Sequence, residues 1–220
     1  AVLSAFASTI SDANFSRIQF TPDLKPMDLI RIVEQREDKL LEFHQGPLFA
    51  NLVLADEINR AHEKTRAALL EAMGEKQITI GKDTFALEEP FFVMATQNPI
   101  DVEGTFFLGA AQLDRFMIKI YTESLSLDEE IIIAKAHQKI DPKINTVISK
   151  NEVIDIQKYI RENVIVTPGI QKDIIQIVRA LRVDGGLVNP DEFYLLPEGE
   201  RGYLYLERAA KTRAFIKGRD

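Results

Sequence analysis

The chain contains no cysteine and only three histidines among its 220 residues. Without cysteine it can form neither disulfides nor thiolate metal sites, and it has no cysteine nucleophile. The histidines, His44, His62 and His137, are scattered without the spacing of metal ligands, so a histidine-centred mechanism is disfavoured. The absence of cysteine suits a reducing compartment, and we expect a soluble cytoplasmic protein.

Long apolar runs and an excess of basic residues are also missing. No apolar stretch approaches the roughly 18 residues that cross a bilayer, and the first apolar residues lack the basic flank of a signal peptide. The formal net charge is −7, which gives no overall basic footprint for nucleic acid. We therefore expect neither membrane insertion nor a nucleic-acid partner. An apolar content of 45% is enough for a real hydrophobic core.

An uninterrupted apolar run ends in two adjacent carboxylates in residues 51–60, which read NLVLADEINR. Such a run predicts a strand buried on both faces of a parallel sheet, and ligands bind at the carboxyl edge of such sheets. At that edge Asp56 can hold Mg²⁺ through water, and Glu57 can polarise an attacking water for phosphoryl transfer. These ten residues alone leave an alternative open, a solvated strand end whose acids cap the next helix.

A second apolar strand is predicted at residues 90–96, and Gln97-Asn98-Pro99 follows it. If the two strands are neighbours, the amide of Asn98 can reach a water or phosphate held near Glu57. The alternative is an ordinary Asn-Pro turn. Further on, a short helix is expected to pass into a third apolar strand at residues 116–120, with Arg115 at the junction. The simple alternative for Arg115 is an ion pair with Asp114 or another nearby acid.

The remaining pattern predicts a strand-rich first part and a helical second part. In the first part we expect helix within 1–14, a strand at 15–20, a helix start at 25–28, a solvated helix or hairpin at 29–43, a helix capped by Asn59 and ending at Gly74, and a projecting hairpin of 77–80 with 84–87. In the second part we expect helices at 128–137, from Ser149, from Thr167 and at 201–217, with a loop at 182–199. This division predicts an α/β domain over residues 1–123 and a helical domain over residues 124–220.

Four motifs in a fixed order give the chain a recognisable pattern. They are LADEINRA at 54–61, AALLEAM at 67–73, ATQNP at 95–99 and AQLDRF at 111–116. Together with residues 18–24 and 46–51 they resemble the MoxR family of AAA+ ATPases, most densely between Arg17 and Lys119. The resemblance implies an AAA+ P-loop NTPase-type parallel sheet core followed by a smaller all-helical lid, with residues 76–87 as the family's pre-sensor hairpin.

The resemblance also implies roles for individual residues, with ATP and Mg²⁺ as cofactors. Asp56 and Glu57 match the Walker B pair, so Asp56 would support Mg²⁺ and Glu57 would activate water. Asn98 matches sensor 1, which orients that water. Arg115 matches the arginine finger, which acts on nucleotide held by the neighbouring subunit. Arg201 lies where the sensor 2 arginine of the lid is expected, although residues 197–200 depart from the family's small-residue run.

One family motif is missing from the sequence. No G-x-x-x-x-G-K-[ST] occurs in the 220 residues, so the backbone cradle and lysine that hold phosphates are not present. The resemblance places Ala1 just after that loop and its preceding strand. We therefore expect the sequence to begin part-way through a longer protein, and its lid to continue beyond Asp220.

Two functions follow from these observations. The first is a MoxR-type ATPase that couples Mg²⁺-dependent ATP hydrolysis to remodelling or maturation of a protein complex. The resemblance implies a homo-oligomeric ring, with a hexamer as the expected size, and a protein substrate or partner with a von Willebrand A domain. The alternative is a non-hydrolysing AAA-like scaffold. The joint presence of Asp56, Glu57, Asn98 and Arg115 favours the ATPase, because a scaffold needs none of them.

Overall fold

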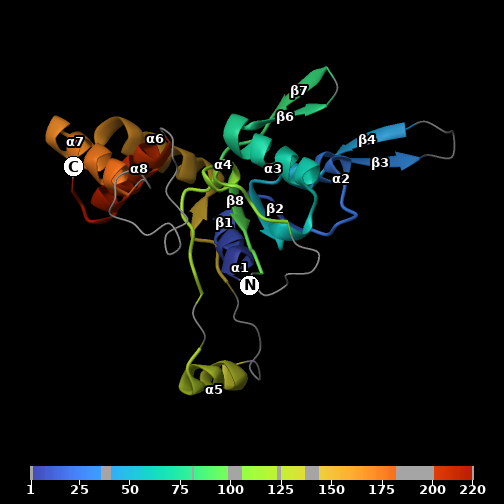
Figure 1. The fold of residues 1–220 in the computed structure, drawn as a ribbon, viewed down its shortest axis with the longest axis horizontal. Helices are drawn as coiled ribbons and strands as arrows, with labels where there is room; N and C mark the ends of the chain where they lie inside the picture. Colours follow the sequence, from blue (N-terminus) through green and yellow to red (C-terminus); the bar gives the residue numbers. More distant parts are fainter. Residues whose placement is uncertain are drawn as a thin grey trace.

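A computed structural model of the chain describes residues 2–35, 41–80, 82–98, 106–122, 125–136, 144–181 and 201–219. At its centre is a small parallel sheet with helices on both faces (Figure 1). Two hairpins project on one side of this body, and a cluster of helices from the C-terminal part lies on the other side. Within the described residues, no helix is long and apolar enough to cross a membrane. The α/β fold class predicted from the sequence is confirmed.

The central sheet contains the two apolar strands predicted from the sequence. Its order is β2 (Phe15–Gln19), β5 (Leu52–Asp56) and β8 (Phe92–Ala95), and both pairings are parallel. Gln19 lies beside Asp56 in the register, and Ala55 lies beside Ala95. Strand β5, which ends at Asp56, and strand β8, which precedes Asn98, are therefore neighbours, and their carboxyl ends meet at one edge. Thr96 and Asn98 follow β8 directly at that edge.

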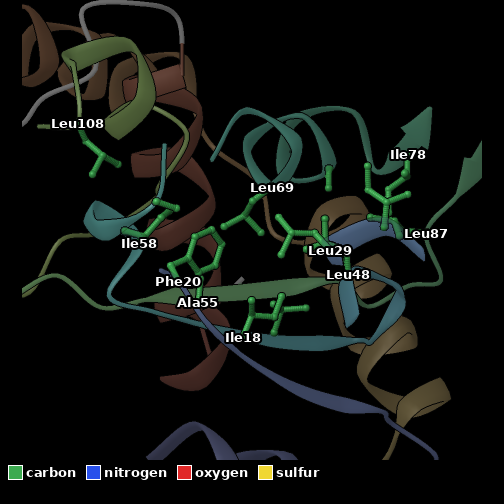
Figure 2. Packing of buried hydrophobic residues seen from close by; sticks show 14 residues of the cluster. Ile18, Phe20, Leu29, Leu48, Ala55, Ile58, Leu69, Ile78, Leu87 and Leu108 are labelled. Atoms are coloured by element: carbon green, nitrogen blue, oxygen red, sulfur yellow. The ribbon is translucent and has the colours of Figure 1, made fainter. Parts of the chain in front are cut away.

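Helices cover both faces of the sheet. On one face α2 (Pro26–Ile30) and α3 (Glu63–Glu75) pack against β2 and β5. Figure 2 shows Leu29 and Leu69 of these helices beside Ile18 and Ala55 of the sheet. On the opposite face α1 (Val2–Ser8) packs through Leu3 on β5. Burial on both faces explains why β5 reads as a continuous apolar run.

The start and end of α3 differ from the prediction. A 3₁₀ turn, η2 (Ile58–Arg60), precedes the helix, and His62 rather than Asn59 is at its N-cap. Asn59 lies within the 3₁₀ turn rather than at the start of the helix, and its buried amide donates to the carbonyl oxygen of Asn98. The helix ends after Glu75, where Lys76 is in the left-handed conformation with φ 54°. Gly74 lies inside the helix, where a Cβ would come within 2.8 Å of the Arg115 guanidinium.

Two antiparallel hairpins extend from the body (Figure 1). The first pairs β3 (Arg31–Gln35) with β4 (Leu41–Gln45), so the hairpin alternative for residues 29–43 is confirmed and the helix alternative is wrong. The short turn η1 (Pro47–Phe49) then leads into β5. The second hairpin pairs β6 (Gln77–Ile80) with β7 (Asp83–Ala86) and projects as predicted.

The third predicted strand is not formed. Helix α4 (Ala110–Leu113) is followed by residues 116–120, which belong to no strand. The side chains of Ile118 and Ile120 are 67% and 81% exposed, and the chain leads away from the sheet toward α5 (Leu127–Ala136). An apolar run becomes a strand only where a neighbouring strand takes up its backbone hydrogen bonds. Here the chain leaves the sheet before it can pair.

The C-terminal helices agree with their sequence signals. Helix α6 (Lys150–Asn163) begins with the predicted capping box, in which Ser149 and Glu152 bond reciprocally. Helix α7 (Pro168–Ala180) begins after Thr167, and α8 (Arg201–Ile216) is the final helix. The loop predicted at 182–199 lies outside the described residues. Aromatic contact between Tyr159 and Phe215, with ring centroids 5.7 Å apart, joins α6 to α8.

Contacts in two regions help to attach this helical cluster to the rest of the chain. One is a parallel strand pair of β1 (Ile10–Ser11) with β9 (Ile148–Ser149), beside an ion pair of Lys150 with Glu88. The strand pair was not predicted. The helix expected within 1–14 ends at Ser8, and β1 follows it. The other attachment joins α8 to the segment after α4. There Arg201 pairs with Asp114 at 3.2 Å.

Candidate functional site

The carboxyl edge of the sheet gathers polar groups from all three strands. Asp56 is the last residue of β5, and Glu57 follows it in the left-handed conformation with φ 54°. Arg17 and Gln19 come from β2, and Thr96 follows β8. Left-handed backbone is unusual for a residue other than glycine, and it is maintained only where the surroundings impose it. The hydrogen bonds at this edge identify what those surroundings are.

Thr96 binds both acidic residues through one hydroxyl group. Its Oγ1 donates to Oδ1 of Asp56 at 2.6 Å and accepts the backbone N–H of Glu57 at 2.9 Å. The carbonyl oxygen of Thr96 also accepts the backbone N–H of Ile58, at 3.0 Å. The turn after β5 is thus held by the residue that follows β8.

The second oxygen of Asp56 faces a cation. Oδ2 accepts hydrogen bonds from Nη2 of Arg17 at 2.5 Å and from Nε of the same guanidinium at 3.2 Å. The Thr96 hydroxyl and the Arg17 guanidinium together hold the pKa of Asp56 below its ordinary value of 3.8. Asp56 is therefore an ionised carboxylate at neutral pH.

Glu57 is held by different partners. Its Oε2 accepts a hydrogen bond from Nε2 of Gln19 at 2.8 Å and lies 3.2 Å from Nε of Arg60. The Glu57 side chain is 28% exposed, so water can reach it. The two neighbouring carboxylates thus have separate environments, one bound to threonine and arginine and the other to glutamine and arginine. Such a difference allows two acids to take different roles.

Asn98 is positioned through its backbone. Its carbonyl oxygen accepts a hydrogen bond from Nδ2 of Asn59 at 3.1 Å, and Asn59 is only 8% exposed. Asn59 belongs to the turn that follows the acidic pair. The structure therefore joins the segment containing Asn98 to the turn that follows Asp56 and Glu57, as the neighbouring strands require.

A buried arginine fixes the chain where it returns to this edge. Arg66 of α3 is 3% exposed, and its Nη1 donates to the carbonyl oxygens of Phe106 and Phe107, both at 3.2 Å. Burial lowers the pKa of Arg66. The backbone N–H of Phe106 donates to the carbonyl oxygen of Asn59 at 2.7 Å. Arg66 of α3 thus holds residues 106 and 107 close to the turn that contains Asn59.

The two arginines predicted for the site are anchored elsewhere. Nη1 of Arg115 donates to the carbonyl oxygen of Leu70 in α3 at 2.7 Å. The backbone carbonyl oxygen of Arg115 accepts a hydrogen bond from the Tyr205 hydroxyl at 3.3 Å. Asp114 pairs with Arg201. The structure therefore brings Asp56, Glu57 and Asn98 to one edge, and it places Arg115 and Arg201 where α3, α4 and α8 meet.

The donor chemistry of the edge suits a hard cation that is shared with a phosphate ligand. Mg²⁺ prefers oxygen ligands and is commonly bound by one or two carboxylates together with water and phosphate oxygens. Within the described ranges, no group of three or more His, Cys, Asp or Glu side chains could hold a metal ion alone. An ionised Asp56 carboxylate suits a Mg²⁺ ion whose other ligands are water and phosphate oxygens.

Sequence reasoning did not identify Arg17, Gln19 or Thr96 as part of this edge. Arg17 and Gln19 alternate along β2, so the strand pattern places them on one face. The register that puts this face beside Asp56 depends on a pairing between strands almost 40 residues apart. A signal for Thr96 existed, because it follows a buried strand directly.

Comparison with known proteins gives consistent results. A family model described as "ATPase family associated with various cellular activities (AAA)" matches residues 1–118. The chain is 39% identical to YeaC of Bacillus subtilis over 222 residues, covering all of this chain and 67% of that protein. It is 37% identical over 222 residues to "Chaperone MoxR1" of Mycobacterium tuberculosis, covering 99% of this chain and 58% of that protein.

More distant and structural relatives agree with this result. "Protein MoxR" of Methylorubrum extorquens is 27% identical over 241 residues, covering all of this chain and 68% of that protein. The crystal structure of a candidate ATPase from Cytophaga hutchinsonii has a TM-score of 0.85 and 39% identity, covering 99% of this chain and 67% of that one. The chain thus spans about three fifths to two thirds of the length of these relatives.

Proposed function

This chain belongs to the MoxR family of AAA+ ATPases, and from that membership we propose that its Asp56–Glu57 edge supports Mg²⁺-dependent hydrolysis of ATP. One observation carries the proposal. Two adjacent carboxylates lie at the carboxyl end of the central parallel strand, and they have different hydrogen-bond partners. Ligands bind at this edge in open α/β sheets.

The two acids divide the work. A bound Mg²⁺ would neutralise charge on the phosphates. Asp56 is the residue to hold it through water, because its carboxylate is ionised and fixed in place by Thr96. Glu57 is the residue to accept a hydrogen bond from the attacking water and to take up its proton, because its side chain remains partly open to solvent. The Asn98 amide would orient the same water.

The arginines are assigned to subunit contacts and to the lid. Arg115 would act on nucleotide bound by the neighbouring subunit, as the arginine finger of the family does. In this conformation its guanidinium is bonded to the Leu70 carbonyl, so action on a phosphate requires exchange of that bond. Arg201 would act as sensor 2, and its pairing with Asp114 connects the helical part to the segment that bears Arg115.

The proposal extends to the assembly. We assign residues 1–123 to the AAA+ core and residues 124–220 to the lid, which the location of the sheet and of helices α5 to α8 supports. We expect a cytoplasmic homo-oligomeric ring, with a hexamer as the expected size, that remodels or matures a protein complex with a von Willebrand A domain partner. Family membership supports the ring, and the name of the relative "Chaperone MoxR1" supports action on a protein complex.

The test is Mg²⁺-dependent ATP turnover by the purified full-length protein and by Glu57→Gln. General-base catalysis contributes about 10²- to 10⁴-fold, so turnover should fall by that range while nucleotide binding is kept. Glu71→Gln, an exposed acid on α3, is the matched control and should keep wild-type turnover. Unchanged turnover in Glu57→Gln contradicts the assignment of the base.

A scaffold without hydrolysis is the second candidate function. The observation that favours it is that both oxygens of Asp56 already have protein partners, Thr96 and Arg17. A wild-type protein that neither binds nor hydrolyses Mg²⁺-ATP would support the scaffold and overturn the ATPase proposal.

A further inference from the structure

Asp56 and Glu57 both face β2, although neighbouring residues of a continuing strand would point to opposite faces. Asp56 bonds to Arg17 and Glu57 bonds to Gln19. These two partners are separated by one residue in β2, so their side chains share one face of the sheet. The chain must therefore turn sharply between the acids, and the left-handed conformation of Glu57 provides that turn.

Thr96 stabilises this turn from the neighbouring strand. Two consecutive backbone N–H groups, those of Glu57 and Ile58, donate to the hydroxyl and carbonyl oxygens of Thr96. The same hydroxyl donates its proton to Asp56. A hydroxyl has one donor and two acceptor positions, so it can make both bonds at once.

Resting on the proposed function, we propose that Thr96 is a positioning residue for hydrolysis, whose hydroxyl fixes the metal-holding carboxylate of Asp56 relative to the water-activating carboxylate of Glu57. Thr96 acts through the two acids and needs no contact with nucleotide. Its β-branched side chain is stiff about χ1, which suits a group that must hold two others in one geometry. The side chain of Arg17, the other partner of Asp56, is 61% exposed.

Thr96 and Arg17 differ in how they combine with a bound cation. Arg17 brings positive charge to Oδ2, so a divalent cation at that oxygen competes with it. Thr96 donates to Oδ1 from a neutral group, and its bond remains compatible with a cation on the other oxygen. Groups that orient a metal ligand in this way typically change metal affinity or activity by 10- to 100-fold when they are removed.

The test compares Thr96→Val with Thr96→Ser in the full-length protein. Valine keeps the branched shape and removes the hydroxyl, whereas serine keeps the hydroxyl. In Thr96→Val we expect kcat for ATP to fall about 10- to 100-fold with KM changed less than about 3-fold, and Mn²⁺ affinity with saturating ADP, measured by electron paramagnetic resonance, to fall about 10-fold. Thr96→Ser should keep both quantities within about 3-fold of wild type.

Thr84→Val, an exposed threonine on the β6–β7 hairpin, controls for loss of a strand hydroxyl and should leave both quantities unchanged. Wild-type kcat and Mn²⁺ affinity in Thr96→Val overturn this inference, as does an equal loss in Thr96→Ser. A folding defect is detected separately by urea denaturation. If Thr96→Val does not fold, kcat and Mn²⁺ affinity are compared instead between Thr96→Ala, which lacks the hydroxyl, and Thr96→Ser, which keeps it. A wild type without turnover overturns the proposed function, whereas normal turnover in Thr96→Val overturns only the role of Thr96.

Discussion

Replacing Arg17 by methionine should strengthen cation binding at Asp56. The guanidinium donates to Oδ2 of Asp56 through Nη2 and Nε, so it occupies the oxygen that Thr96 leaves open. A divalent cation bound through that oxygen must first displace the guanidinium. Methionine keeps much of the length of the side chain without its charge, so it removes the competitor and leaves the β2 backbone pairing intact.

The size of the effect follows from the exposure of the pair. The side chain of Arg17 is 61% exposed and that of Asp56 is 22% exposed, so solvent screens the ion pair. Pairs of this kind contribute about 0.2–1 kcal/mol. At about 1.4 kcal/mol for a tenfold change in binding constant, Mn²⁺ affinity should rise roughly 1.4- to 5-fold.

The assay is Mn²⁺ titration with saturating ADP, followed by electron paramagnetic resonance. Lys64→Met, which removes an exposed cation from α3, controls for the general change in net charge. The gain should disappear when Arg17→Met is combined with Asp56→Asn. Weaker Mn²⁺ binding in Arg17→Met, or the same gain in Lys64→Met, would refute competition at Asp56.

Two further predictions concern stability. Asn51 is fully buried, and its side chain bonds to the Asn14 N–H at 3.0 Å and to the Glu88 carbonyl at 3.2 Å. Asn51→Ala should therefore lower the free energy of unfolding in urea by about 2–4 kcal/mol. The control, Asn163→Ala at an exposed position, should change it by no more than about 0.5 kcal/mol. Equal effects of the two would contradict this reading of Asn51. Asp56 is stabilised as a carboxylate, since its folded pKa lies below 3.8, so its contribution is complete above that pH and is lost as pH falls through the folded value. The difference in free energy of unfolding between wild type and Asp56→Asn should therefore narrow below about pH 4. A difference that widens on acidification would contradict a lowered pKa of Asp56 in the folded state.

Much of the fold was predictable because local patterns were strong. The uninterrupted apolar runs of β5 and β8 predicted a parallel sheet, and the capping residues Ser149 and Thr167 marked the starts of α6 and α7. These signals depend on residues close in sequence, and packing agrees with them. The same reasoning misplaced the cap of α3, because a 3₁₀ turn that contains Asn59 precedes the helix.

The incorrect and missed features depend on distant partners. Residues 116–120 have the composition of a strand, yet they do not pair with one. Arg17 and Thr96 bond to Asp56 across 39 and 40 positions of sequence, so no local pattern reveals those contacts. The acidic pair itself was visible because two charged residues directly after a buried run are conspicuous. Its hydrogen-bond partners required the strand register.

The two attachments of the helical cluster have a mechanical consequence. One is the β1–β9 strand pair and the other is the Arg201–Asp114 ion pair. The strand pair restrains the start of α6 through backbone hydrogen bonds, whereas the ion pair restrains α8 through side chains alone. The second attachment adjoins Arg115, whose guanidinium is bonded to α3. Displacing α8 would therefore pull first on Asp114 and Arg115, which it contacts directly, and not on the acidic pair, whose bonds to Arg17, Gln19 and Thr96 lie within the edge of the sheet.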